Sequence, residues 1–148
     1  VYRYLLRGNE EQLVTLDTEL NFIQSYFYLL HARYGEAVKL NAEADEAQRS
    51  CLIPPLTLLT LFENAFNHNA IHKDSPLCIS VRVSQHNWLE LEHNIKKKTT
   101  SIPPDESGIQ NLSEKIRLLT QQQIRIRTSG TQRIIQLPLI KNETADVI

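Results

Sequence analysis

Apolar residues that recur at helical spacing predict a long helix near the start of the chain. The pattern begins at Thr15 or Asp17, either of which can cap a helix, and it runs to about Tyr34, where Gly35 predicts its end. Two apolar stripes lie side by side on this helix, so we expect it to contact two surfaces, its own domain and a neighbouring helix. The stripes consist of Leu16, Leu20, Ile23, Phe27, Leu30 and Tyr34, and of Phe22, Tyr26 and Leu29.

Alternating apolar and polar residues predict strands in the rest of the chain, and most of these strands come in pairs. Residues 1–7 look like the end of a helix that begins upstream, 46–53 like a connector and 94–108 like a polar loop. This order of elements favours an α+β fold, a two-layer sandwich with one mixed sheet and helices on one face, preceded by the long helix. Strands are expected over 38–45, 77–85 and 88–93 and in a hairpin over 123–140, and helices over 56–68 and 109–121, the last with Leu112, Ile116 and Leu119 on its apolar face.

The expected helix after Pro54-Pro55 has an unusual polar side. Solvated helix faces are usually built from good helix formers such as Lys and Glu, whereas this one carries Asn, His and Thr. These short side chains with donor and acceptor atoms suit a bound polar ligand, and an amide oxygen can join the ligands of Mg²⁺. The apolar side consists of Leu58, Leu59, Leu61, Phe62, Ala65 and Phe66, and the polar side of Thr57, Thr60, Asn64, Asn67 and His68, with Glu63 at the border.

The composition excludes several other classes of protein. With 41% hydrophobic and 22% charged residues, the chain of 148 residues is typical of one soluble globular domain, and no apolar run could span a bilayer. A net charge of -1 argues against a nucleic-acid binder that relies on bulk electrostatics. Cys51 and Cys78 fit no metal or redox spacing and are expected to be core thiols in a reducing compartment. Because the chain begins with Val and contains no Met, we expect it to be an internal or C-terminal piece of a longer protein.

The stretch "LIPPLTLLTLFENAFNHN" closely resembles the asparagine box of LytS-type sensor histidine kinases, whose ATP-binding domains have the GHKL (Bergerat) fold. Glu63, Asn64, Ala65 and His68 match the family pattern, and Asn67 replaces its Lys. Upstream, "LVTLDTELNFIQSYFYLLHARYG" resembles the helix that leads into the ATPase domain. Downstream, "SGIQNLSEKIRLL" resembles the second glycine box with its helix, and "GTQRIIQLPL" resembles the closing hairpin.

This resemblance implies an ATP-binding catalytic domain over 36–141, after the end of a dimerisation and phosphotransfer region over 1–35 and before a tail over 142–148. It implies ATP and Mg²⁺ as cofactors, phosphoryl transfer to a histidine and then to a response regulator of the LytTR type, and a homodimer formed through upstream helices. The piece would be the cytoplasmic domain of an inner-membrane protein and would not bind nucleic acid. The implied catalytic residues are Glu63 and Asn64, with Asn64 on Mg²⁺, and the implied ATP-binding residues are Asn64, Asn67, His68, His93, Asn94, Gly108, Gly130 and Thr131.

The chain also departs from the family pattern. His93 stands where the first glycine box has the Asp that binds the adenine amino group, and neither glycine of that box is present. Only Gly108 remains of the second box, although glycines let backbone amides approach phosphates closely. No histidine has the context of the phosphoacceptor. These departures leave an alternative open, a degenerate non-catalytic module that acts in dimerisation or in docking of a regulator.

Three further groups of residues allow weaker interpretations. His68 and His72 have the spacing of two metal ligands on a helix, but no third ligand is evident. Lys96, Lys97 and Lys98 could attract phosphate, although a solvated loop is the simpler interpretation. Arg125 and Arg127 alternate on an expected strand and would lie on its solvated face.

Overall fold

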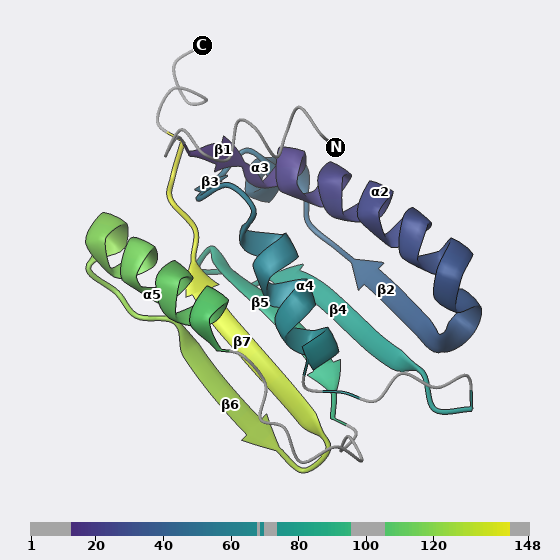
Figure 1. Ribbon diagram of the computed structural model, residues 1–148. Coiled ribbons are helices and arrows are strands. Elements are labelled where there is room, and N and C mark those ends of the chain that lie inside the picture. The colour runs from purple at the N-terminus through teal and green to yellow at the C-terminus, as the bar shows by residue number, and fades with distance from the viewer. Residues whose placement is uncertain (1–12, 68, 70–73, 96–105, 143–148) are drawn as a thin grey trace.

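A five-stranded mixed sheet forms one layer of the molecule (Figure 1). The computed structural model describes residues 13–67, 69, 74–95 and 106–142. The strand order is β2-β4-β5-β7-β6, with β2 parallel to β4 and every other neighbouring pair antiparallel. The strands are β2 (Val38–Ala42), β4 (Leu77–Val83), β5 (Trp88–Asn94), β6 (Arg125–Ser129) and β7 (Gln132–Pro138).

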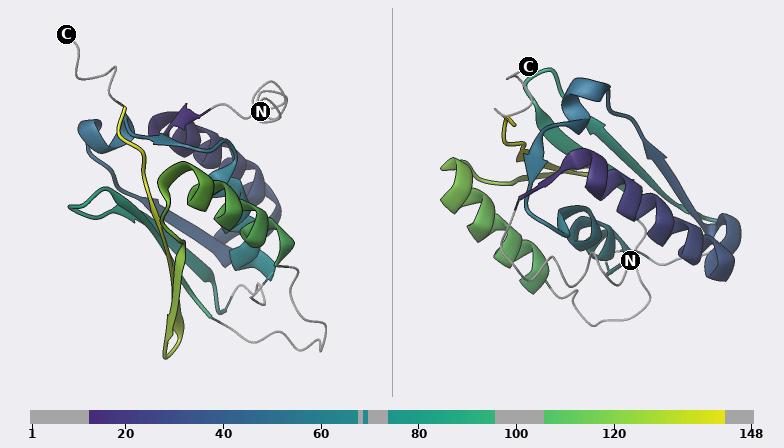
Figure 2. Two further views of the ribbon diagram at one scale, coloured as in Figure 1. Left: turned by 90° about the vertical axis from the view of Figure 1, so that its left-hand side faces the viewer. Right: turned by 90° about the horizontal axis from the view of Figure 1, so that it is seen from above.

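Three helices form the second layer on one face of this sheet (Figures 1 and 2). They are α2 (Leu16–Tyr34), α4 (Thr57–Asn67) and α5 (Ser107–Thr120). The helix α4 lies between the other two and contacts both. The expected α+β sandwich with helices on one face is therefore confirmed. Among the described residues, no helix has the length and apolar character needed to cross a membrane.

Residues 46–53, which are expected to form a connector, contain two short elements. These are the helix α3 (Glu46–Arg49) and the strand β3 (Leu52–Ile53), which pairs with β1 (Val14–Thr15) in a separate antiparallel ribbon. The strand expected over 38–45 ends at Ala42, because Asp45 and Gln48 form a capping box that starts α3. A turn of 3-10 helix, η2 (Gly35–Ala37), joins α2 to β2.

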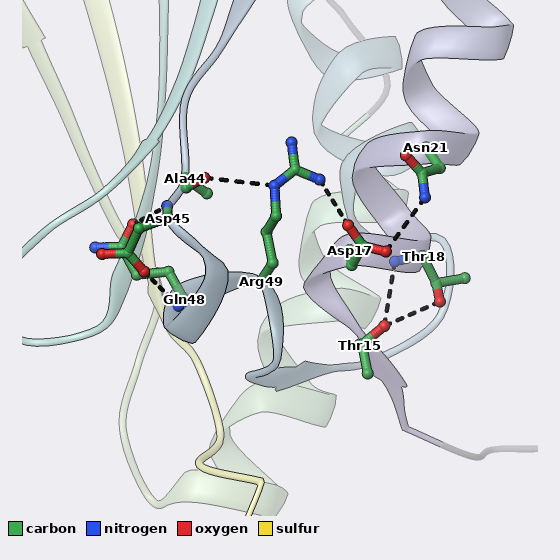
Figure 3. Close-up of polar contacts among 8 residues, drawn as sticks. All are labelled: Thr15, Asp17, Thr18, Asn21, Ala44, Asp45, Gln48 and Arg49. Carbon is green, nitrogen blue, oxygen red and sulfur yellow. Dashed lines mark hydrogen bonds and ion pairs between the residues drawn. The ribbon is translucent and has the colours of Figure 1, made fainter. Parts of the chain in front are cut away.

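Hydrogen bonds at the start of α2 fix the direction in which the helix leaves the ribbon (Figure 3). Thr15 is the N-cap, and its hydroxyl accepts a bond from the N–H of Thr18. Arg49 then ties α3 to α2, since its guanidinium lies 2.7 Å from Asp17 and also donates to the carbonyl of Ala44. The helix ends as expected at Gly35, which has a positive φ of 58°.

One core lies between the two layers, and α2 belongs to it. Leu16, Leu20 and Ile23 are buried together with apolar side chains of α4, α5 and the inward-facing residues of the sheet. The domain boundary expected at residue 35 remains a prediction, but the residues of α2 share a core with those that follow. In α5, the expectation that Leu119 packs in the core is wrong. Its side chain is 50% exposed in the last turn, where it lines a shallow pocket with Pro54 and Pro55, and Ile109 is buried instead.

Candidate functional site

The helix α4 presents the predicted site residues on its side away from the core. It begins after Pro54 and Pro55, and Leu56 has a left-handed backbone with φ of 65°. Leu58, Leu61, Phe62 and Ala65 are buried, as the helical spacing predicts. Thr57 and Asn64 were expected on the polar side and are also buried, so the polar side of α4 is only partly in contact with solvent.

Asn64 is the most unusual of these residues because its amide is buried between α4 and the start of α5. The side chain is 3% exposed. Its Nδ2 donates to Oε2 of Glu106 over 3.1 Å, whereas its Oδ1 has no hydrogen-bond partner within the described part of the chain. A buried acceptor without a partner costs free energy, and native structures contain few of them. The carbonyl oxygen of Asn64 is therefore a buried acceptor whose hydrogen-bonding capacity is unused among the described residues.

A pocket of about 170 Å³ lies beside Asn64, between α4 and the first turn of α5. Glu63 and Asn67 stand exposed at its α4 side. The first N–H groups of a helix have no partner within the helix and carry a partial positive charge, and the pocket lies at this end of α5. The pocket is lined by Thr60, Glu63, Asn64, Asn67, Ser107, Gly108 and Ile109.

The remaining predicted residues gather at one end of the sheet. His93 and Asn94 end β5, and the N–H of Ile95 donates to the carbonyl of Thr131 over 2.6 Å. Gly130, with φ of 60°, makes the hairpin turn before Thr131, as the sequence predicted. The end of β5 and the hairpin turn therefore lie next to one another. The predicted residue His68 lies outside the described residues, as do His72, Lys96, Lys97 and Lys98.

His93 and Asn94 already make contacts within the protein. The ring of His93 is fully buried, and its Nδ1 lies 2.9 Å from the carbonyl oxygen of Asn94 and 3.3 Å from Nδ2 of Asn69. The amide of Asn94 donates to the carbonyl of Pro76 and accepts from the N–H of Cys78, which holds the start of β4. The structure thus places Asn64 beside a pocket and His93 inside the protein.

Two charged residues that the sequence analysis did not single out join these groups. Arg133 on β7 lies directly opposite His93 on β5, on the face of the sheet that the helices cover, and it is buried. Burial lowers the pKa of Arg133, and the Glu106 carboxylate opposes that shift. Glu106 also accepts the bond from Asn64, so it interacts both with Asn64 on α4 and with Arg133 on β7. The alternation of β7 could have revealed Arg133, because it occupies an inward position shared with Ile135 and Leu137.

A second pocket of about 290 Å³ lies between α2 and α4, on the other side of Glu63 and Asn67. Its lining is mixed, with the aromatic rings of Tyr26, Tyr34 and Phe66 beside the charged Arg33 and Glu63. Burial raises the pKa of Tyr26, and the charge of Glu63 adds to that shift. Two residues of α4 therefore line both pockets. No cluster of three or more His, Cys, Asp or Glu that could hold a metal ion occurs in the described ranges.

Sequence comparisons point to one class of protein. A family model described as histidine kinase matches residues 1–38. The sensor histidine kinase/phosphatase LytS of Staphylococcus aureus strain MRSA252 is 34% identical over 67 residues, and LytS of strain Mu50 matches with the same identity and length. The matched segment is 45% of this chain, but the chain spans only 12% of the length of these relatives.

Solved structures agree at the level of the fold. The histidine kinase AdeS of Acinetobacter baumannii has a TM-score of 0.54 at 13% identity, covering 95% of this chain and 75% of its own. The catalytic domain of the histidine kinase ThkA has a TM-score of 0.53 at 9% identity, covering 89% of this chain and 99% of its own. Over part of its length the chain is therefore a homologue of the LytS sensor histidine kinases, and it has the fold of histidine-kinase catalytic domains.

Proposed function

We propose that the chain is the ATP-binding catalytic domain of a two-component sensor histidine kinase, with a nucleotide site of the GHKL (Bergerat) type. The observation that carries the proposal is the buried carbonyl oxygen of Asn64, which lacks a partner in the described part of the chain and lies beside a pocket at the start of α5. A helix N-terminus attracts phosphate, and an amide oxygen binds Mg²⁺. The pocket would thus combine N–H donors for phosphate, at the start of α5, with an amide oxygen for Mg²⁺, on Asn64.

The residues around the pocket fit a magnesium nucleotide. Asn64 would hold the cation through Oδ1, and the neighbouring Glu106 adds an oxygen donor of the kind that Mg²⁺ prefers. Bound there, Mg²⁺ would neutralise the charge of the phosphates. A carboxylate this close to the pocket would repel phosphate on its own, so we expect nucleotide binding to depend strongly on the cation. Asn67 and the first amides of α5 would orient the phosphates, and the exposed Glu63 would orient the attacking group.

The activity of the whole protein is a further part of the proposal. The chain covers 12% of LytS, so the phosphoacceptor histidine, the dimerising helices and any membrane anchor would lie in other parts of the full-length protein. The γ-phosphoryl group would pass to that histidine and then to a response regulator, for which we favour the LytTR type. Catalysis would rest on positioning and on neutralisation of charge.

A degenerate domain that does not use ATP is the second candidate. The observation that favours it is the burial of His93 at the end of the sheet, opposite Arg133, which occupies an inward position on the neighbouring strand. The family resemblance assigns recognition of adenine to the position of His93, so a buried ring at this position favours the degenerate module. Such a module would act in dimerisation or in docking of a regulator.

Thermal unfolding with and without Mg²⁺ and a non-hydrolysable ATP analogue separates the two candidates. If the site binds, the analogue at a hundredfold over its dissociation constant stabilises the fold by about 2.7 kcal/mol, a rise of several degrees in Tm. We expect this rise to require Mg²⁺ and to disappear in Asn64→Ala. The matched control is Asn111→Ala, which removes an exposed amide from α5 and should keep the full rise. No rise at millimolar analogue would favour the degenerate module.

Gly108 gives a second, smaller test of the same site. A methyl group at this position would lie 3.4 Å from Cγ2 of Thr60, an ordinary contact, so Gly108→Ala should change the free energy of unfolding by less than about 1 kcal/mol. The methyl group would, however, stand at the mouth of the pocket and reduce the rise in Tm that the analogue produces. Gly35→Ala is the opposite control, because φ of 58° makes it destabilising by about 1 kcal/mol or more while the pocket is untouched. Undiminished binding by Gly108→Ala would show that phosphate does not approach this turn.

A further inference from the structure

A buried carboxylate of α2 caps the helix that carries the candidate site. Glu19 is 1% exposed, and its two oxygens accept hydrogen bonds from the N–H groups of Leu56, over 3.2 Å, and Leu58, over 3.0 Å. Glu19 and these two amides are 37 and 39 residues apart in the sequence. The contact therefore joins two separate helices through directional bonds.

The first turn of α4 depends on this contact because the local sequence supplies no side-chain acceptor there. The first N–H groups of a helix find no partner inside it and are usually bonded by a Ser, Thr, Asp or Asn at the cap position. Leu56 has an apolar side chain, and the hydroxyl of Thr57 donates to the carbonyl of Pro54 over 2.6 Å. The cap of α4 is thus supplied by α2.

Aromatic rings make further contacts between α2 and α4, beside the aliphatic side chains of the shared core. Tyr26 meets Phe62 edge to face with centroids 6.1 Å apart, and Tyr34 lies 6.2 Å from Phe66. Figures 1 and 2 show the two helices side by side. Ring contacts tolerate small sliding movements, whereas hydrogen bonds lose strength steeply when distance or angle changes. Unlike the ring contacts, the directional bonds of Glu19 therefore resist a movement of α4 along its axis.

The carboxylate of Glu19 has both a cost and a benefit for stability at this place. Burying an ionisable group costs several kcal/mol unless its bonds offset the loss of hydration, and a well-packed apolar residue of similar volume is often as stable or more stable. The neighbours of Glu19 on the same helix face, Leu16, Leu20 and Ile23, are all apolar. A leucine would fit this pattern, but it would leave the first amides of α4 without their acceptor.

We propose that Glu19 is a positioning residue that sets where Asn64 stands in the nucleotide pocket, so that a shift of α2 moves the site. This inference rests on the proposed function. Asn64 follows Leu58 by six residues, about 9 Å along a rigid helix at 1.5 Å per residue. The segment matched by the histidine-kinase family model, residues 1–38, contains α2. Movements in the preceding part of a longer protein would thus reach Asn64 through Glu19.

Substitutions of Glu19 separate positioning from stability. Glu19→Leu fills the volume without accepting bonds, and Glu19→Gln keeps the shape while its NH₂ group faces an N–H donor. Thr15→Ala is the matched control, since it removes the cap of α2 and leaves the bonds to α4 in place. For each variant of the 148-residue chain we would measure Tm, affinity for the Mg²⁺ complex of the ATP analogue, and the side-chain amide NMR signal of Asn64, assigned from its absence in Asn64→Ala.

We expect both Glu19 variants to fold and to bind the analogue about tenfold more weakly, because polar contacts to a ligand weaken steeply when their distances and angles change. The Asn64 amide signal should shift in both, and Thr15→Ala should bind like the unsubstituted chain. Unchanged affinity and an unmoved Asn64 signal in Glu19→Leu would overturn the inference, as would an equal loss of affinity in Thr15→Ala. If the unsubstituted chain binds no analogue, the proposed function fails, and the Asn64 signal still decides whether Glu19 positions this side chain. If Glu19→Leu does not fold, the isosteric Glu19→Gln carries the test.

Discussion

Replacing Phe62 by alanine is expected to cost about 3–5 kcal/mol of the free energy of unfolding, which is the usual cost of removing a fully buried phenyl ring. The ring is fully buried on α4 and packs against Tyr26 and Phe66, with centroids 6.1 and 5.4 Å away. A domain of this size is stable by about 5–15 kcal/mol, so the substitution removes a large part of the total. Urea titration would measure the loss directly, and Tm should fall by about 10 °C.

The control for this substitution is an equally apolar residue on the neighbouring helix. Leu118 on α5 is 78% exposed, and Leu118→Ala should change the free energy of unfolding by less than about 0.5 kcal/mol. A loss below about 1 kcal/mol in Phe62→Ala would mean that α4 does not pack against α2 and the sheet as described. It would also remove the basis for treating α4 as a rigid carrier of Asn64.

The sequence predicted the arrangement of the main elements because their signals are local. Helical spacing located α2 and α4, alternation located β4, β5 and the β6–β7 hairpin, and Gly35 and Gly130 marked an end and a turn. The short elements α3 and β3 were missed because few residues define them. The cap that starts α3 comes from Asp45 and Gln48, and β3 is defined by its pairing with β1.

The candidate site was predictable only as a set of residue types on α4. The sequence placed Asn64 and Asn67 on the polar side of this helix and Glu63 at its border, and all three line one pocket in the structure. It gave no indication that Glu106 would bond Asn64 from 42 residues away, because such a contact depends on how α5 packs against α4. The roles of these residues toward ATP stay predictions.

Glu19 shows a different limit of sequence analysis. Its position three residues after Leu16 and one before Leu20 put it on the apolar face of α2, which is the pattern of a buried charge. Its partners could not be predicted, because they are backbone N–H groups rather than a complementary side chain. A carboxylate on an apolar face is therefore a reason to look for a distant helix that lacks a cap.

The stability of the chain is expected to fall as pH rises from about 5 to 8, and Glu19 is expected to cause part of that fall. Burial raises the pKa of Glu19 from 4.5 to about 7, against the lowering effect of hydrogen bonds from the N–H groups of Leu58, Leu56 and Thr57. Between these two values the folded chain binds more protons than the unfolded chain, so stability decreases with pH. The raised pKa of Glu19 contributes about 3 kcal/mol to the free energy of unfolding. This contribution is fully present below pH 4.5 and is lost as pH rises through about 7.

Urea titrations at pH 5 and pH 8 on the unsubstituted chain and on Glu19→Gln isolate this contribution, because other groups titrate equally in both. The unsubstituted chain should lose about 2.5 kcal/mol more than Glu19→Gln between the two pH values, since a part of the total is already lost below pH 5. Glu114→Gln, on the exposed side of α5, is the matched control and should keep the full loss. An equal loss in all three chains would mean that the three backbone bonds outweigh burial and hold Glu19 ionised throughout. In that case the cap of α4 carries a full charge at pH 5, and the affinity of the site for nucleotide should not depend on Glu19 protonation in this range.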